Sequence, residues 1–252
     1  MLQTQRRGLR LNHRNVAAAH GQSRPRLSLQ FLSAATLCLV LSGQGEAAQP
    51  LTCAGSSVVV EAADPADREA GCRGAESAAA FLAASGVDTQ VPVRISFVES
   101  LPPSVGALPA VGCYVRSEDR VYVLSFARCQ HKKLEHDVVI DRPVHVGLVT
   151  HEVAHAIVRA DPRGAKLGLV AHEYIAYVAM YATMLPDRRG EVLAQIPGDG
   201  FESELHINSF VYAVDPVRFG AQAYRHYLKP GIGRSFLASV LNGQVVLDVE
   251  AR

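Results

Sequence analysis

The sequence has no tryptophan, only three methionines and no excess of charge of either sign, with 25 basic and 24 acidic residues. A balance this close to neutral argues against a nucleic-acid partner, because phosphate binding needs an excess of lysine and arginine. No apolar run reaches the roughly 18 residues that a membrane-spanning helix requires. Since 48% of the 252 residues are apolar, the chain can bury a sizeable core, and disorder is not expected.

The first 48 residues have the order of a secretory signal peptide. Residues 1–30 hold six arginines and no acidic residue, residues 31–41 are mostly apolar, and small residues follow up to Ala48. A short apolar stretch between a basic region and small residues is typical of a cleaved signal. We therefore expect residues 49–252 to form a single exported domain, periplasmic or extracellular, with no stable membrane span. The alternative is a basic tail with a membrane-anchoring helix.

Four cysteines remain after the expected cleavage site, at positions 53, 72, 113 and 129. An even number in an exported domain predicts two disulfides, and three pairings are possible. We favour the sequential pairs Cys53–Cys72 and Cys113–Cys129, because each closes a short loop. A metal site built from all four thiolates is the rival interpretation, although the sequence lacks a CxxC pair.

Strand patterns dominate the first half of the expected domain, and helical patterns dominate the second. Strands are expected over residues 57–61, 91–98, 111–115 and 120–126, the last two as a hairpin. Helices are expected over residues 74–85, 141–160, 165–184, 201–213, 216–228 and 233–241. The sequence therefore predicts an α+β fold, with a small β-rich part over 91–129, a helical pair over 141–184 and a helical region over 199–242.

The motif His151-Glu152-Val153-Ala154-His155 lies in the helix expected to begin at Asp141. Residues four apart lie on one helix face, so both imidazoles can bind one zinc ion at about 2.0–2.1 Å. Glu152 lies about 100° round the helix from His151, beside the metal rather than on it. It can take a proton from a zinc-bound water, whose pKa the metal lowers to about 7. The pattern indicates general-base hydrolysis, and two histidines four apart by chance are the alternative.

A catalytic zinc ion needs a third protein ligand and an open coordination position. The next expected helix carries Glu173, 18 positions beyond His155, within His172-Glu173-Tyr174-Ile175-Ala176. In these residues the chain resembles the gluzincin group of zinc metallopeptidases, in which HExxH is followed by a ligand glutamate on the next helix. The resemblance implies one zinc ion held by His151, His155 and Glu173.

The resemblance also implies a zincin-like fold and a peptide or protein substrate. An edge strand, expected at residues 120–126, would hold an extended peptide beside the metal through backbone hydrogen bonds. Thermolysin-like members carry an aspartate four residues after the ligand glutamate, where it orients a zinc-bound imidazole. This chain has Tyr177 at that position. Another group, such as a backbone carbonyl, must therefore orient the imidazole.

Other side chains could complete or support such a site. His172 and Asp161 are rival third ligands, although the metzincin pattern that would use Asp161 needs a glycine where this chain has Val158. His145 is far round the helix from the motif and is not expected to be a ligand. Four downstream side chains could stabilise an oxyanion: His206, Tyr212, Tyr224 and His226. We favour His206, because it follows the helix pair closely.

These observations favour a secreted or periplasmic zinc-dependent metallopeptidase that uses Glu152 as general base. The alternative is a zinc-containing binding or scaffold domain that has lost turnover. A third possibility is an exported helical domain without a metal. The substrate, the cleavage preference and the oligomeric state do not follow from the sequence.

Overall fold

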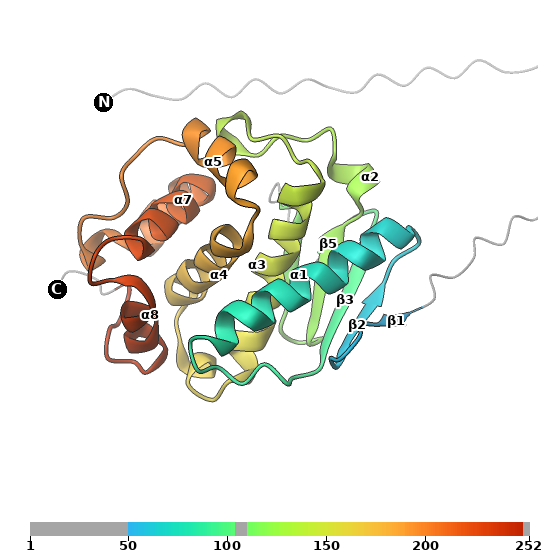
Figure 1. Cartoon of the computed structure of the whole chain (residues 1–252), viewed down its shortest axis with the longest axis horizontal. Helices are drawn as coiled ribbons and strands as arrows, with labels where there is room; N and C mark the ends of the chain where they lie inside the picture. Colours follow the sequence, from blue (N-terminus) through green and yellow to red (C-terminus); the bar gives the residue numbers. More distant parts are fainter. Residues whose placement is uncertain (1–49, 104–109, 249–252) are drawn as a thin grey trace, which may run out of the picture. The chain divides into compact units, whose positions relative to one another are not determined.

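The computed structural model describes residues 50–103 and 110–248, so the signal peptide expected over residues 1–48 lies outside the described part (Figure 1). The described residues belong to one compact unit of the chain. A small mixed sheet is followed by a mostly helical remainder, which confirms the α+β prediction. None of the helices in this part is long and apolar enough to cross a membrane.

The strands form a five-stranded sheet in the order β1-β2-β3-β5-β4. They are β1 (Leu51–Thr52), β2 (Val58–Glu61), β3 (Val93–Val98), β4 (Gly112–Val115) and β5 (Arg120–Leu124). β2, β3 and β5 are parallel, whereas β1 and β4 pair antiparallel at the two edges. The hairpin prediction is confirmed, but the edge strand expected at residues 120–126 is wrong. β5 pairs with β3 as well as with β4, so it lies inside the sheet, where Val121 and Val123 are fully buried, and β4 forms the edge.

Helix α1 (Pro65–Ala83) connects the parallel strands β2 and β3. The Asp64 side chain caps it by accepting a hydrogen bond from the Ala66 backbone at 2.9 Å. The helix begins nine residues before the predicted Gly74, because this capped first part carries charged residues that obscure the helical period. Cys72 in α1 forms the predicted disulfide with Cys53, which fastens the helix to the loop before β2.

The second predicted disulfide, Cys113–Cys129, is wrong, because both cysteines are free. Cys129 lies in the short helix α2 (Phe126–Cys129), which turns its side chain into the apolar core, where the thiol donates a hydrogen bond to the Phe126 carbonyl oxygen. Cys113 lies on β4, at the edge of the sheet, and is half-buried.

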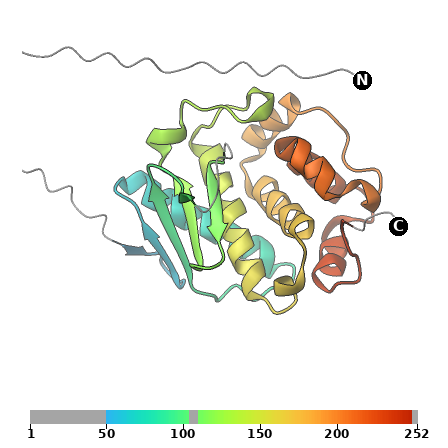
Figure 2. The same ribbon diagram turned by 180° about the vertical axis from the view of Figure 1, so that it is seen from behind.

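The rest of the described chain is helical. Its helices are α3 (Arg142–Ala160), α4 (Leu169–Thr183), α5 (Pro186–Gln195), α6 (Ser209–Val214), α7 (Pro216–Tyr227) and α8 (Gly233–Leu241). α3 lies between the sheet and α4, and α7 packs against α4 (Figure 2). The predicted helix over 201–213 is shorter than expected: α6 begins only at Ser209, where the Asn208 side chain accepts a hydrogen bond from the Val211 backbone.

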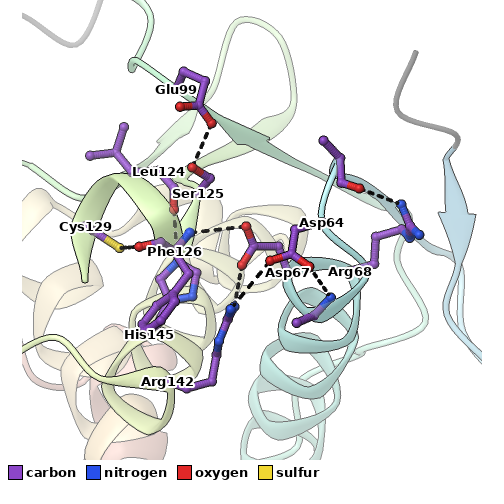
Figure 3. A network of polar contacts seen from close by, with 12 residues as sticks. Asp64, Asp67, Arg68, Glu99, Leu124, Ser125, Phe126, Cys129, Arg142 and His145 are labelled. Atoms are coloured by element: carbon purple, nitrogen blue, oxygen red, sulfur yellow. Dashed lines mark hydrogen bonds and ion pairs between the residues drawn. The ribbon is translucent and has the colours of Figure 1, made fainter. Parts of the chain in front are cut away.

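A buried polar network holds the first turns of α3 against α1 and α2 (Figure 3). The buried Asp67 carboxylate of α1 pairs with Arg142 and accepts a hydrogen bond from the Phe126 backbone at 3.2 Å. His145 donates a hydrogen bond from Nε2 to the Leu124 carbonyl oxygen at 2.9 Å, which agrees with the expectation that it is not a ligand. These contacts fix the direction of the helix that carries the HExxH motif.

Candidate metal centre

Three side chains from α3 and α4 converge on one point. The Nε2 atoms of His151 and His155 lie 3.1 Å apart, and the Glu173 carboxylate oxygens lie 3.3 Å from His151 Nε2 and 3.5 Å from His155 Nε2. Ligands about 2.0–2.1 Å from a tetrahedral zinc ion are separated by roughly 3.3 Å. All three spacings are close to that value, so this group can hold one metal ion.

The turn between α3 and α4 brings the ligands together. Gly147 near the start of α3 lies against Met180 and Met184 near the end of α4, so the two helices run antiparallel. At Gly164 a Cβ atom would lie 2.0 Å from the Val158 carbonyl oxygen, so only glycine fits this turn.

The two rival third ligands take part in this turn. Asp161 forms an ion pair with Arg163, with Oδ2 and Nη2 2.7 Å apart, and therefore braces the turn. His172 Nε2 donates a hydrogen bond to the Gly164 carbonyl oxygen at 3.1 Å. Neither residue belongs to the group that could hold a metal ion.

The electrostatics of the group suit a cation. Burial would raise the pKa of Glu173, but the neighbouring His155 and His151 lower it to about 2, so the carboxylate is ionised. Burial lowers the pKa of His155 to about 3, which keeps this imidazole neutral. Burial also opposes protonation of His151, but the Glu173 carboxylate outweighs it and raises the pKa. The Glu173 carboxylate and the His155 imidazole are therefore in the forms that bind metals, and His151 would release its proton when a metal ion binds.

Glu173 also retains unused acceptor capacity. Its Oε2 atom is buried and accepts no hydrogen bond from the described residues. A buried carboxylate oxygen without a donor is costly unless a cation or a water satisfies it. The orphaned atom, together with the ligand spacing, therefore fits a metal ion bound between α3 and α4.

Glu152 lies outside the metal group, on the side of α3 that faces the edge strand β4. A Cβ atom at Gly112 would lie 2.9 Å from Glu152 Cγ and 3.1 Å from its Oε1, so the absent side chain makes room for this carboxylate. Burial raises the pKa of Glu152 to about 7, although His151 and a hydrogen bond from the Tyr114 backbone lower it. A carboxyl group in this environment can exchange a proton near neutral pH.

The metal group opens on a cavity of about 730 Å³. Of the four side chains that could stabilise an oxyanion, Tyr212 of α6 lines this cavity, and its pKa is raised by burial and by the neighbouring Glu173 carboxylate. His206 lies exposed on the short turn η4 (Glu204–His206) and does not line the cavity. Tyr224 and His226 are buried elsewhere, the latter accepting a hydrogen bond from the Tyr174 hydroxyl at 2.8 Å. The structure therefore brings Tyr212, and not His206, to the metal group.

Tyr177 packs against His151, with ring centroids 4.3 Å apart. The buried Nδ1 atom of His151 has no hydrogen-bond partner among the described residues, so the backbone carbonyl expected to orient this ring is not seen. Gly220 of α7 also lies against Tyr177, since a Cβ atom added at Gly220 would lie 2.2 Å from the tyrosine ring. Close packing of α7 on α4 therefore holds the tyrosine ring against the histidine.

Comparison with known proteins yields one match. A family model described as "Family of unknown function (DUF6639)" matches residues 58–250, a range that includes the metal group and Glu152. No curated protein and no solved structure matches the chain. The family description therefore assigns no chemistry to the site.

Proposed function

This chain belongs to DUF6639, a family of unknown function, and from its site we propose that it is a zinc-dependent metallopeptidase. The convergence of His151, His155 and Glu173 carries the proposal, because their spacing fits a single tetrahedral ion. Two histidines and one glutamate are a common ligand set of catalytic zinc, with the fourth position open to water. A bound zinc ion would polarise the substrate carbonyl and lower the pKa of the water.

Glu152 is the proposed general base. Its carboxylate lies between α3 and β4, beside the metal group, where it can accept a proton from the attacking water and later deliver it to the leaving amine. The Tyr212 hydroxyl is the proposed donor to the oxyanion, because it lines the cavity and already lies at the ligand Glu173. One such donor typically contributes about 2.7–4 kcal/mol to the transition state.

The edge strand supports a peptide as substrate. The Leu124 backbone of β5 donates to the Val111 carbonyl oxygen at 2.8 Å, so Cys113 also faces β5 in the alternating antiparallel pattern. The backbone groups of Gly112 and the carbonyl of Tyr114 then point away from β5, toward the open edge beside Glu152, to which the Tyr114 backbone N–H donates. An extended peptide can pair with them by strand addition, with a carbonyl carbon beside the metal group.

The disulfide supports export. A bond between Cys53 and Cys72 persists in oxidising compartments and is rare in the cytosol of mesophiles. We therefore propose that the enzyme acts in the periplasm or outside the cell.

A pair of variants tests the proposal. Purified wild type should contain one zinc ion per chain by elemental analysis and should hydrolyse peptides in a mixed library. Glu152→Gln should keep the zinc and lose hydrolysis, because the amide cannot accept the proton. His206→Ala should change neither, because this histidine is exposed outside the cavity. Wild type that binds one zinc ion but hydrolyses nothing would instead support the inactive scaffold domain.

A further inference from the structure

The cavity has two chemically different ends along α3. Leu148 lies three residues before His151, and Arg159 lies four residues after His155, so these side chains mark opposite ends of the motif. The lining near Leu148 is apolar and belongs to one hydrophobic cluster: Leu134, Leu148, Met180, Tyr181 and Val217. The lining near Arg159 also contains Arg116 and His172.

Two contacts and one electrostatic effect bring this second group together. Arg159 Nη1 donates a hydrogen bond to the Ala165 carbonyl oxygen at 2.7 Å, and His172 Nε2 donates to the neighbouring Gly164 carbonyl oxygen at 3.1 Å. Arg116 is close enough to His172 to act on it electrostatically, so it belongs to the same end of the cavity. The positive charge at this end comes from the two arginines.

Neither arginine has its charge neutralised within the described part of the chain. No ion pair joins Arg116 or Arg159 to a carboxylate there, whereas seven other arginines and lysines form such pairs. At the apolar end, Glu135 lines the cavity and is likewise without an ion pair among these residues. The cavity therefore has opposite charges at its two ends, and a ligand with a carboxylate is favoured at one end and repelled at the other.

We propose that Arg116 and Arg159 bind a carboxylate group of the peptide substrate, a proposal that rests on the peptidase function. From Glu152 to Arg159 the helix rises by roughly 10 Å, which equals about three residues of extended peptide. The recognised carboxylate therefore lies about two or three residues from the scissile bond.

The direction of strand addition decides where this carboxylate comes from. β4 runs from Gly112 beside Glu152 to Val115, the residue before Arg116. A peptide that adds antiparallel to β4 places residues before the scissile bond beside the arginine, so an aspartate or glutamate side chain is bound. A peptide that adds in parallel places the residues after that bond there, so a free C-terminal carboxylate can also be bound.

Peptide libraries with free and amidated C-termini distinguish these sources. Cleavage sites are determined by mass spectrometry. Enrichment of acidic residues before the cleaved bond in the amidated library would show that the arginines bind an acidic side chain. Cleavage only in the library with free C-termini would show that they bind the terminal carboxylate. Equal cleavage of acidic and neutral sequences in both libraries would overturn the proposal.

One charge-reversing and one charge-removing variant test the two arginines themselves. Arg116→Glu should lower the preference for substrates with the carboxylate over neutral substrates about tenfold. It should instead favour substrates with a lysine at the position of the carboxylate. Arg159→Gln, which keeps a donor for the Ala165 carbonyl oxygen, should weaken the preference for the carboxylate less. Arg94→Glu is the matched control, because this arginine is exposed on β3, outside the cavity. An Arg116→Glu enzyme with wild-type preference would contradict the proposal.

A binding measurement separates this proposal from the peptidase function. Zinc-loaded Glu152→Gln protein is titrated with two pools of C-terminally amidated hexapeptides, one that contains glutamate and one that contains glutamine in its place. In the second arm, the same two pools carry free C-terminal carboxylates. Tighter binding of the glutamate pool or of the free acids, abolished by Arg116→Glu, supports the carboxylate site even if wild type hydrolyses nothing. Equal binding of all pools contradicts it, whatever the hydrolysis assay shows.

Discussion

Replacing Gly112 by alanine tests whether the position of Glu152 controls the chemistry. The added Cβ atom would lie 2.9 Å from Glu152 Cγ, 3.1 Å from its Oε1 and 3.2 Å from the Tyr122 carbonyl oxygen. Since the carbonyl belongs to the sheet, the glutamate side chain is the group that can move. Restoring an ordinary contact of about 3.6 Å moves Cγ by roughly 0.7 Å.

A shift of about 1 Å in a reacting group can lower the rate by about a hundredfold. We therefore expect Gly112→Ala to lower kcat by roughly 10- to 100-fold. Zinc affinity should stay within about twofold of wild type, because the alanine contacts none of the three ligands. The assay pairs steady-state peptide hydrolysis with zinc competition against a chromogenic chelator.

The control is Gly190→Ala, at a helical position where an added Cβ atom meets nothing within 4 Å. This variant should match wild type in both measurements. A Gly112→Ala enzyme with unchanged kcat would show that Glu152 does not need its present position, and the general-base assignment would lose its support. Parallel loss of zinc and activity would instead point to a structural effect of the substitution.

Three further predictions concern the disulfide, the packing behind the metal group and the buried histidine. Replacing Cys53 and Cys72 together by alanine should lower the free energy of unfolding by about 3 kcal/mol, because the disulfide joins residues 19 positions apart and restricts the unfolded chain. Urea unfolding measures this change. Gly220→Ala should weaken zinc binding roughly tenfold in a chelator competition, because the new Cβ atom displaces Tyr177 from a ligand histidine. His145, whose pKa burial lowers, stays neutral in the folded state, so stability falls as pH drops below about 6.5 while the unfolded chain takes up the proton. His145→Asn should flatten the loss of stability between pH 7.5 and 5.5, and an unchanged slope would count against this explanation.

Several features of the fold follow from local patterns in the sequence. The Asp141 cap and the apolar period predicted α3 within a residue of its observed start, because capping and periodicity act over a few neighbours. Helical geometry predicted that His151 and His155 share one face of α3, because it is a local constraint that the sequence carries directly. The resemblance to gluzincins supplied Glu173, and the structure brings the three side chains together.

Features that depend on distant contacts did not follow from the sequence. The edge of the sheet depends on which strand pairs with β3, and neither hairpin strand carries a signal for that choice. The proposed Cys113–Cys129 bond assumed that a short separation implies proximity, whereas α2 turns Cys129 into the core. The favoured oxyanion donor His206 was chosen by position along the chain, but the short α6 helix brings Tyr212 to the cavity instead.

Glycines near the site were also missed, for a related reason. Gly112 and Gly220 matter because of what approaches them from other elements, Glu152 in one case and Tyr177 in the other. A single sequence has no signal for such an approach. The one indication of close packing that a sequence offers is a glycine inside an expected strand or helix. Glycine weakens both elements, so it is found there where backbone or side chains pack closely.

Zinc titration of wild type and Glu173→Ala, side by side after chelation, tests the metal group most directly. We expect one zinc ion per wild-type chain and an affinity loss of roughly a hundredfold or more in the variant, because the variant loses one of three protein ligands. Equal affinity in the two proteins, or no zinc bound by folded wild type, would show that these three side chains do not form a zinc site.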